Sequence, residues 1–198
     1  MDILNNRYKA AYERSNPSES KDRELHRFLF LDIDGVLNTI RYSDYLIDHD
    51  EDEFDEYGAL FDSEAVANLT YIIEKLPDVK IIISSTWRFK GWEWMNRLWV
   101  MRQLPGSIFS FTPVLEEVCF VDKVNRTNSS SVYPIGTRGL EINEWLRTHA
   151  SLNSFSYKYI ILDDEKDLLL EQQDNLILTD PYYGITKKDV LKALEMLL

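Results

Sequence analysis

Two carboxylates stand where a buried strand should end. In the segment RFLFLDIDGVLN the apolar run 28–31 leads into Asp32 and Asp34, and the chain turns at Gly35. Because side chains alternate along a strand, the two carboxylates face the same way as the strand finishes. Glycine suits the turn because it adopts backbone conformations that other residues avoid. A pair of carboxylates on one side can bind a hard cation or carry a proton, so this segment predicts a chemical site.

Polar side chains also follow two later apolar runs. KIIISSTWR places Ser84 and Ser85 after one run, and YIILDDEKD places Asp163 and Asp164 after another. Ligands of open parallel sheets gather at the carboxyl ends of the strands. Four carboxylates at one edge would repel each other unless a cation lay among them, and oxygen ligands of this kind suit Mg²⁺. Any one pair could instead cap the turn or helix that follows it, but three strands with such endings favour a shared site.

The elements that position these residues follow an alternating pattern. Short apolar runs alternate with helical patterns, which indicates βαβ units and a mostly parallel sheet. Runs that are apolar throughout indicate strands buried on both faces. The predicted fold is therefore α/β, a Rossmann-like sheet with helices on both faces. The predicted strands are 28–31, 79–83, 159–162 and the shorter 176–178.

Three helices are predicted between or after these strands. The first follows Asp62 or Ser63, either of which can act as its N-cap, and ends at Pro77. The second begins near Leu140, and the third begins at a capping box in TKKD. The side chains expected to face the core are Val66, Leu69, Ile73 and Leu76 in the first helix, Leu140, Ile142, Trp145 and Leu146 in the second, and Val190, Leu191, Leu194 and Leu197 in the third.

The chain has 198 residues, enough for one domain with its own core, and we expect no second domain. The main domain is assigned to residues 27–198. Residues 1–26 are interpreted as an N-terminal arm, either a weak helix or a loose segment. The acid-rich stretch 39–61 is too polar for the core and predicts a loop or small flap over the edge of the sheet. Residues 114–136, which are rich in Ser and Asn, predict a loop insertion.

The composition limits the class of partner and compartment. The chain carries 34 acidic and 22 basic residues, a net charge of −12, which opposes binding along a phosphate backbone but leaves room for a local basic pocket. Extended nucleic-acid binding is therefore not expected. Cys119 is the single cysteine, so no internal disulfide can form. We find no apolar signal-peptide core and no run as long as a membrane span, so we expect a cytoplasmic protein, with its oligomeric state open.

Four segments, in order, resemble the motifs of the haloacid dehalogenase (HAD) superfamily, whose phosphatases use an aspartyl-phosphate intermediate. FLDIDGVLN resembles the first motif, IIISS the second, RGLEINEWL the third and IILDD the fourth. With TDPYYGIT near the end and SSTWR after the second strand, the chain is similar to small HAD-like domains of bacterial and phage proteins, some linked to RNA repair. The resemblance covers Arg27 to Leu198 and implies a HAD-type fold with a minimal cap.

The resemblance implies a role for each matched carboxylate. Asp32 would be the nucleophile, and Asp34 would protonate the leaving oxygen and then activate water. Mg²⁺ would lie between Asp32, Asp163 and the backbone carbonyl of Asp34. Asp164 would bind the ion directly or through water. Asp167 could complete this acidic set, but we interpret it as a solvated helix residue.

The remaining polar residues are implied to contact substrate, and each has an alternative. Ser84 would hydrogen-bond a phosphate oxygen because it follows the apolar run directly, but one step in register would put Ser85 there instead, so Ser85 stays a candidate for substrate binding. Arg138 would steady the phosphoryl charge where the family more often has lysine. It is preferred to Lys123 because a helical pattern follows it at once. Arg88 could clamp the substrate or pair with the acidic edge of the sheet.

We therefore expect a Mg²⁺-dependent phosphatase or phosphotransferase that forms an aspartyl-phosphate. Only about twenty residues separate the first motif from the following helix, so the cap is loop-sized and the site is open. Such a site could admit a nucleotide, a sugar phosphate, or a 3′- or 5′-phosphate at a nucleic-acid end, and the sequence leaves this choice open. The other classes considered are a non-catalytic HAD-like module for protein contacts and a receiver-like domain, which normally carries its phosphoacceptor and acidic pair on different strands.

Overall fold

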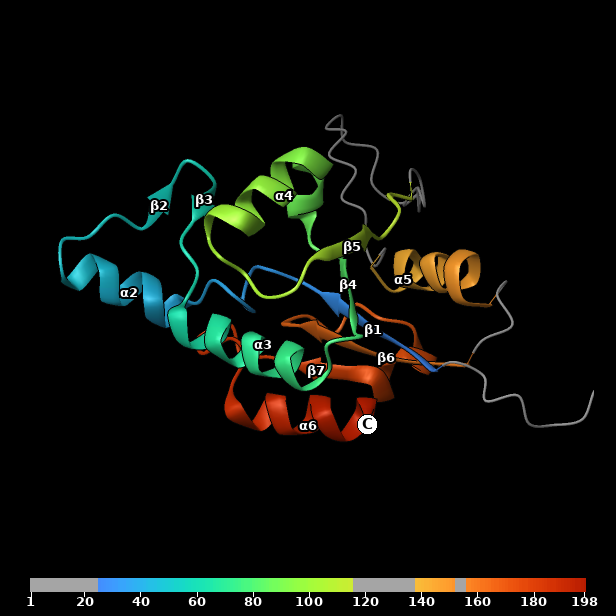
Figure 1. Cartoon of the computed structure of the whole chain (residues 1–198). Helices are drawn as coiled ribbons and strands as arrows, with labels where there is room; N and C mark the ends of the chain where they lie inside the picture. The colour runs from blue at the N-terminus through green and yellow to red at the C-terminus, as the bar shows by residue number, and fades with distance from the viewer. Residues whose placement is uncertain (1–24, 116–137, 152–155) are drawn as a thin grey trace, which may run out of the picture.

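The computed structural model describes residues 25–115, 138–151 and 156–198 (Figure 1). The elements along the chain are β1 (Leu25–Leu31), α2 (Ile40–Asp48), β2 (Phe54–Asp55), β3 (Gly58–Ala59), α3 (Ser63–Lys75), β4 (Lys80–Ile83), η1 (Thr86–Lys90), α4 (Trp92–Met101), β5 (Ile108–Phe111), α5 (Arg138–Leu146), η2 (Arg147–Ser151), β6 (Ser156–Asp163), η3 (Leu170–Asn175), β7 (Leu176–Leu178) and α6 (Lys187–Leu197). Most of the arm 1–26 and of the loop insertion 114–136, with Cys119 and Lys123, lies outside these residues. None of the helices in the described part of the chain has the length and apolarity that crossing a bilayer requires.

Five of the described strands form one sheet in the order β5–β4–β1–β6–β7, and each neighbouring pair is parallel. From the central β1 the chain runs outward to β4 and β5, and then returns to the other side of β1 to form β6 and β7. This reversal makes the carboxyl end of β1 a topological switch point, where ligands of such sheets bind. The predicted α/β fold with a Rossmann-like parallel sheet is confirmed.

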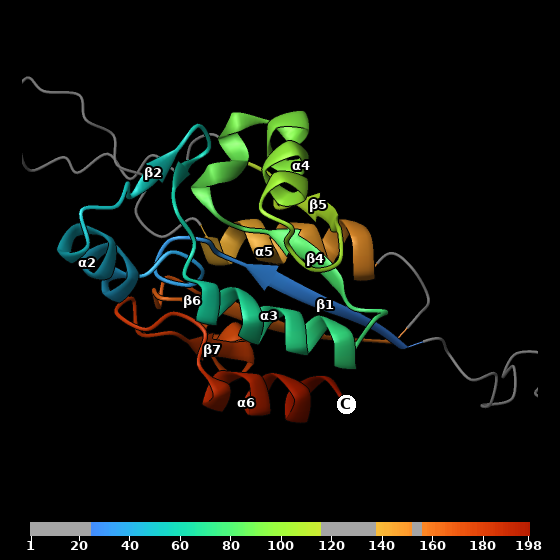
Figure 2. The same ribbon diagram turned by 60° about the vertical axis from the view of Figure 1, so that its left-hand side comes forward.

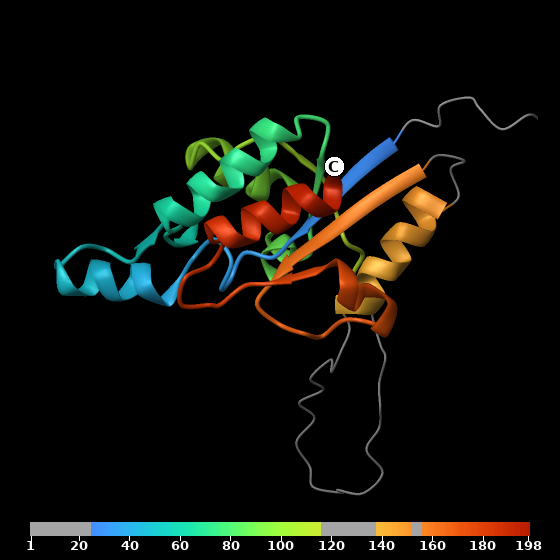
Figure 3. The same ribbon diagram turned by 90° about the horizontal axis from the view of Figure 1, so that it is seen from below.

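Helices cover both faces of the sheet and form two cores. Along β1, Leu29 and Leu31 belong to the larger core, which contains side chains of α3, α4 and α6. Phe28 and Phe30 belong to the smaller core under α5, where the Trp145 ring packs edge-on against theirs with centroid distances of 5.0 and 5.4 Å. Figures 2 and 3 show α3 and α6 side by side on one face and α5 on the other. Burial on both faces explains why the strand sequences are apolar throughout.

The helix caps follow the sequence closely, whereas one residue of the last helix was wrongly predicted to face the core. Asp62, not Ser63, is the N-cap of α3, and the Thr186–Asp189 capping box opens α6. Leu191 was expected in the core but is 69% exposed. The side chains that α6 buries are those of Val190, Ala193 and Leu197.

The acid-rich segment 39–61 contains the helix α2 and the hairpin β2–β3 rather than a loop. Thr39 caps α2 by accepting a backbone N–H bond, and Leu46 is buried beneath the helix. The first amides of α2 donate to the carbonyls of Pro181 and Tyr182 at 3.0 and 3.2 Å. The polar segment is helical because the N-terminus of α2 is capped and its first amides are hydrogen-bonded to this distant turn. Figure 2 shows α2 and β2 beyond the tip of the β1 arrow, the end of the sheet where the predicted site residues lie.

Candidate active site

Strand register brings three of the predicted residues into one row across the sheet. Leu31, the last residue of β1, lies beside the last residue of β4 and beside Leu162 of β6. The pairing continues for one more residue, since the Ser84 N–H donates to Leu31 O at 2.9 Å and the Asp32 N–H donates to Leu162 O at 3.0 Å. Asp32 therefore lies between Ser84 and Asp163, on neighbouring strands that are spaced about 4.8 Å apart.

The three residues also share one face of the sheet. Each follows by two positions a side chain of the core under α5, namely Phe30 before Asp32, Ile82 before Ser84 and Ile161 before Asp163. Alternation along the strands therefore places all three under the start of α5. Ser85 has the opposite phase, and its hydroxyl accepts the Trp87 N–H at 3.3 Å as the cap of η1. The geometry thus sets Ser84, rather than Ser85, beside Asp32.

Arg138, the first residue of α5, brings positive charge to this row. Its Nη1 contacts one carboxylate oxygen of Asp32 and one of Asp163. The Arg138 side chain is 15% exposed, whereas those of Asp32 and Asp163 are 5% and 0% exposed. The next residue, Gly139, lets the start of the helix approach the loop between β6 and η3, since a Cβ there would lie 2.6 Å from Leu169 N. This close approach carries the guanidinium over the carboxylates.

Burial shifts the protonation equilibria of the cluster. It raises the pKa of Asp163 to about 7, while the charge of Arg138 opposes the rise and the charge of Asp32 adds to it. Burial and the Asp32 charge also raise the pKa of Asp164. Burial lowers the pKa of Arg138, but the charges of Asp32 and Asp163 outweigh it, so the pKa of Arg138 is raised and the guanidinium stays charged.

Asp164 completes a group of three carboxylates. One oxygen each from Asp32, Asp163 and Asp164 lies within 4.8 Å of the others. Asp164 can reach this position because Gly35 has a φ of +64° and no side chain, and a Cβ at Gly35 would overlap the Asp164 carboxylate. The three carboxylates offer only oxygen atoms as metal ligands, and their combined negative charge exceeds the single positive charge of Arg138. Such a group suits a hard cation such as Mg²⁺. The residues therefore fit the metal that the sequence predicts.

Asp34 stands apart from this group and is exposed. Its Oδ1 accepts a bond from Asn38 Nδ2 at 2.7 Å, and the side-chain Oδ1 of Asn38 in turn accepts the Gly35 N–H at 3.1 Å. The indole Nε1 of Trp87 donates to both carboxylate oxygens, at 3.1 and 3.0 Å. Asp34 is thus held by two neutral donors, neither of which we assigned to the site from the sequence. SSTWR after the second strand was noted in the sequence, but only as a resemblance.

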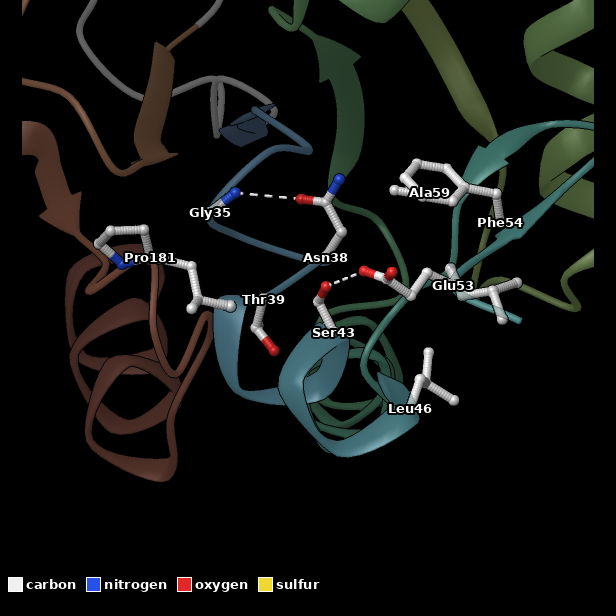
Figure 4. Close-up of a pocket in the computed structure, with 11 residues that line it drawn as sticks. Gly35, Asn38, Thr39, Ser43, Leu46, Glu53, Phe54, Ala59 and Pro181 are labelled. Carbon is white, nitrogen blue, oxygen red and sulfur yellow. Dashed lines mark hydrogen bonds between the residues drawn. The ribbon is translucent and has the colours of Figure 1, made fainter. Parts of the chain in front are cut away.

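A cavity of about 260 Å³ adjoins Asn38, one of the two residues that hold Asp34 (Figure 4). Its lining comes from the loop after β1, from α2, from the segment of the β2–β3 hairpin and from Pro181 in the turn after β7. Figure 4 shows the Asn38–Gly35 bond on one side and the bonded pair Ser43 and Glu53 nearer the hairpin. The cap segment therefore forms one wall of a recess next to the first motif.

Arg88 lies in a buried ion pair. Its Nη2 donates to Glu141 Oε2 at 2.6 Å, and the two side chains are 4% and 7% exposed. Its Nη1 donates to the carbonyls of Ser84 and Ser85, both at 2.8 Å. Arg88 therefore joins the end of β4 to α5. Its partner Glu141 lies about one helical turn after Arg138. The ion pair is therefore with a helix residue, Glu141, and not with the acidic edge of the sheet that was considered as the alternative. A substrate contact from Arg88 stays a prediction.

Replacing Glu141 with alanine should lower the free energy of unfolding by about 3–5 kcal/mol, because it leaves the Arg88 guanidinium buried without its counter-ion. Urea unfolding followed by circular dichroism measures this loss. Glu144→Ala is the matched control on the same helix, since Glu144 pairs with the exposed Arg147 and such pairs contribute little. Similar stabilities of the two variants would contradict the bracing role of the buried pair.

Two buried hydroxyls near the row have no hydrogen-bond partner among the described residues, Ser84 Oγ and Thr112 Oγ1. Thr112 extends β5 as Ser84 extends β4, since its N–H donates to Ile83 O at 3.0 Å. Buried hydroxyls are normally satisfied, so the Ser84 hydroxyl beside Asp32 is available to a ligand oxygen. The sequence analysis missed Thr112, although it follows an apolar segment, IFSF, much as Ser84 follows III.

Comparison with known proteins identifies one matching family. The family described as "HAD domain in Swiss Army Knife RNA repair proteins" matches residues 28–190, which include the end of β1, the motif segments and the start of the C-terminal helix α6. No curated protein and no solved structure matches the chain.

Proposed function

Since the chain belongs to the family of HAD domains in Swiss Army Knife RNA repair proteins, we propose that it is a Mg²⁺-dependent phosphohydrolase that acts through an aspartyl-phosphate. Asp32 is the nucleophile in this proposal, and Asp34 is the acid and then the base. A phosphotransferase would share the first half of the reaction and differ in the acceptor, an alcohol instead of water.

The observation that carries the proposal is the row Ser84–Asp32–Asp163 beneath Arg138. A nucleophilic carboxylate, a buried hydroxyl without a partner in the described structure and a guanidinium converge there. A transferred phosphoryl group needs these three things, namely an attacking oxygen, a hydrogen-bond donor and a compensating positive charge. A module used only for protein contact has no need of this arrangement, nor of the acid at Asp34.

The reaction proceeds in two displacements. An oxygen of Asp32 attacks phosphorus, the bond to the leaving oxygen breaks, and Asp34 gives its proton to that oxygen. Asp34, now ionised, takes a proton from water, whose oxygen attacks the phosphorus of the aspartyl-phosphate. The Asp32–phosphorus bond then breaks, which releases inorganic phosphate and restores both carboxyl groups. Ser84 and Arg138 hold the phosphoryl oxygens through both steps.

Four residues would hold Mg²⁺ in this proposal. Asp32 and Asp163 would bind it with side-chain oxygens, Asp34 with its backbone carbonyl, and Asp164 directly or through water. When bound, the ion supplies positive charge that offsets the charge of the phosphoryl group and of the carboxylates. Arg138 carries one positive charge and so offsets only one of the three carboxylates in the group.

Hydrolysis of p-nitrophenyl phosphate, measured with and without Mg²⁺, tests the proposed function. We expect turnover that needs Mg²⁺ and is lost after chelation. A folded chain that binds Mg²⁺ but releases no phosphate from any monoester would favour the non-catalytic module instead.

Among phosphate monoesters, we propose the ends of polynucleotides as the first substrate class to examine, because the family description names RNA repair proteins. The small cap supports this choice, since an open site can receive the end of a long chain. The test compares kcat/KM for oligonucleotides that carry a 3′- or a 5′-phosphate with that for glycerol phosphate. Equal values would mean that the nucleic acid contributes nothing to recognition.

Replacing Asp163 with alanine should weaken Mg²⁺ binding, because it removes a buried ligand from the group of three. Titration calorimetry with Mg²⁺ measures the affinity directly, without turnover. Asp167→Ala is the matched control, since Asp167 lies in the loop that follows Asp163 but outside that group. Equal affinities in the two variants would take Asp163 out of the metal site.

A further inference from the structure

Trp87 makes a bond that no assigned role explains. Its Nε1 lies 3.1 and 3.0 Å from the two oxygens of Asp34, a residue 53 positions away in the sequence. We propose that Trp87 is a positioning residue that orients the acid Asp34 toward the leaving group. This inference rests on the proposed function and assigns the residue that makes its acid effective.

The chemistry of the donor suits this task. An exposed aspartate is free to change rotamer, whereas general acid catalysis needs its carboxyl group within hydrogen-bond reach of the leaving oxygen. A cationic partner would hold the carboxylate but would oppose its protonation. The indole N–H is neutral and lies within reach of both oxygens. It can therefore stay bonded to one oxygen while the other carries the proton.

The surroundings of Trp87 hold the indole in place. Ser85 caps the start of η1, on which Trp87 lies, and the indole packs against Phe61 and Trp94 with centroid distances of 5.6 and 6.1 Å. The guanidinium of Arg102 lies 5.9 Å from the centroid of the Trp87 ring. The ring is thus fixed from several sides, which a positioning residue requires.

The cap hairpin is joined to the same indole. Gly58 packs onto the ring with a φ of +104°, and a Cβ there would lie 3.3 Å from a ring carbon. Arg102 holds this hairpin by donating to Asp55 Oδ1 at 2.6 Å, to Ala59 O at 2.8 Å and to Gly58 O at 3.1 Å. Trp87 therefore links the cap to the acid, so that the hairpin and Asp34 keep a fixed relation.

The experiment compares Trp87→Phe with Trp94→Phe on two substrates, glycerol phosphate and p-nitrophenyl phosphate. Trp94 is the matched control because it belongs to the same aromatic cluster, whereas the bond to Asp34 comes from Trp87. Loss of one hydrogen bond should slow phosphoryl transfer from the alkyl ester by about 3- to 10-fold, with a smaller loss on the aryl ester, whose leaving group needs less protonation. Trp94→Phe should slow both substrates equally or not at all.

A double-mutant cycle with Asp34→Asn separates positioning from general damage to the fold. If Trp87 acts through Asp34, Trp87→Phe should cause no further loss in the Asp34→Asn background. Should Trp87→Phe unfold the chain, 3-benzothienylalanine incorporated at position 87 removes the N–H while keeping the ring. Additive losses, or equal losses on the two esters, would overturn the inference while leaving the proposed function intact. An inactive wild-type chain would overturn both.

Discussion

Replacing Asp32 with asparagine is expected to reduce turnover of p-nitrophenyl phosphate by roughly 10⁴-fold or more, because an amide cannot form the aspartyl-phosphate. The fold should survive, since the two side chains are nearly isosteric and the asparagine carbonyl oxygen can still accept the Ile33 N–H that bonds Asp32 at 2.8 Å. Steady-state kinetics with an unfolding curve for each variant measures both expectations.

The matched control for Asp32 is Asp174→Asn, which changes an exposed carboxylate on η3. It should leave turnover unchanged. Residual activity of Asp32→Asn above about one hundredth of the wild-type rate would contradict the nucleophile assignment, because loss of a nucleophile costs far more than that.

Asp34→Asn is the second change with a large expected effect. General acid–base assistance contributes roughly 10²–10⁴-fold, and an alkoxide leaving group depends on it most. The variant should therefore lose more activity on an alkyl phosphate than on p-nitrophenyl phosphate, when rapid-quench kinetics isolates phosphoryl transfer. Mg²⁺ affinity should stay close to that of the wild type, because the proposed contact of residue 34 with the ion uses the backbone.

The local structure should tolerate Asp34→Asn without rearrangement. An asparagine side chain still offers a carbonyl oxygen to Asn38 Nδ2 and Trp87 Nε1, so the loop after β1 can keep its bonds. Equal losses on the alkyl and aryl esters, with Mg²⁺ affinity unchanged, would mean that Asp34 orients the site and does not supply a proton.

The strands were predictable from the sequence where they are buried on both faces. Residues 28–31 and 159–162 are apolar throughout because each side of the sheet carries a core, and they lie within β1 and β6. β5 was not predicted, because this edge strand contains the exposed Phe109 and the polar Ser110, whose hydroxyl accepts the Trp145 Nε1–H at 2.7 Å. Its pairing is visible only once the neighbouring strand and α5 are in place.

The site was predictable where its chemistry is local in the sequence. Asp32, Asp163 and Asp164 directly follow or end apolar strands, and Arg138 opens a helical pattern. The choice between Ser84 and Ser85 required the register of β4 against β1, which periodicity alone does not give.

Contacts between segments far apart in the chain could not be predicted from the sequence. Trp87 and Asp34 are 53 positions apart, and so are Arg88 and Glu141. A tryptophan or a buried arginine has several partners available to it in a folded chain, and only the packing of η1 against the β1 loop and α5 selects among them. The structure therefore adds the residues that hold the site, whereas the sequence predicts those proposed to do the chemistry.

The order of the strands divides the candidate site between two parts of the chain. Asp32, Asp34 and Ser84 precede residue 115, whereas Arg138 and the acidic pair at the end of β6 follow residue 137, and β1 lies between β4 and β6. A chain split between residues 115 and 138 would yield two fragments, each with part of the row. Under the proposed mechanism neither fragment alone would cleave a phosphate ester, so phosphate release from the mixture would report fragment complementation.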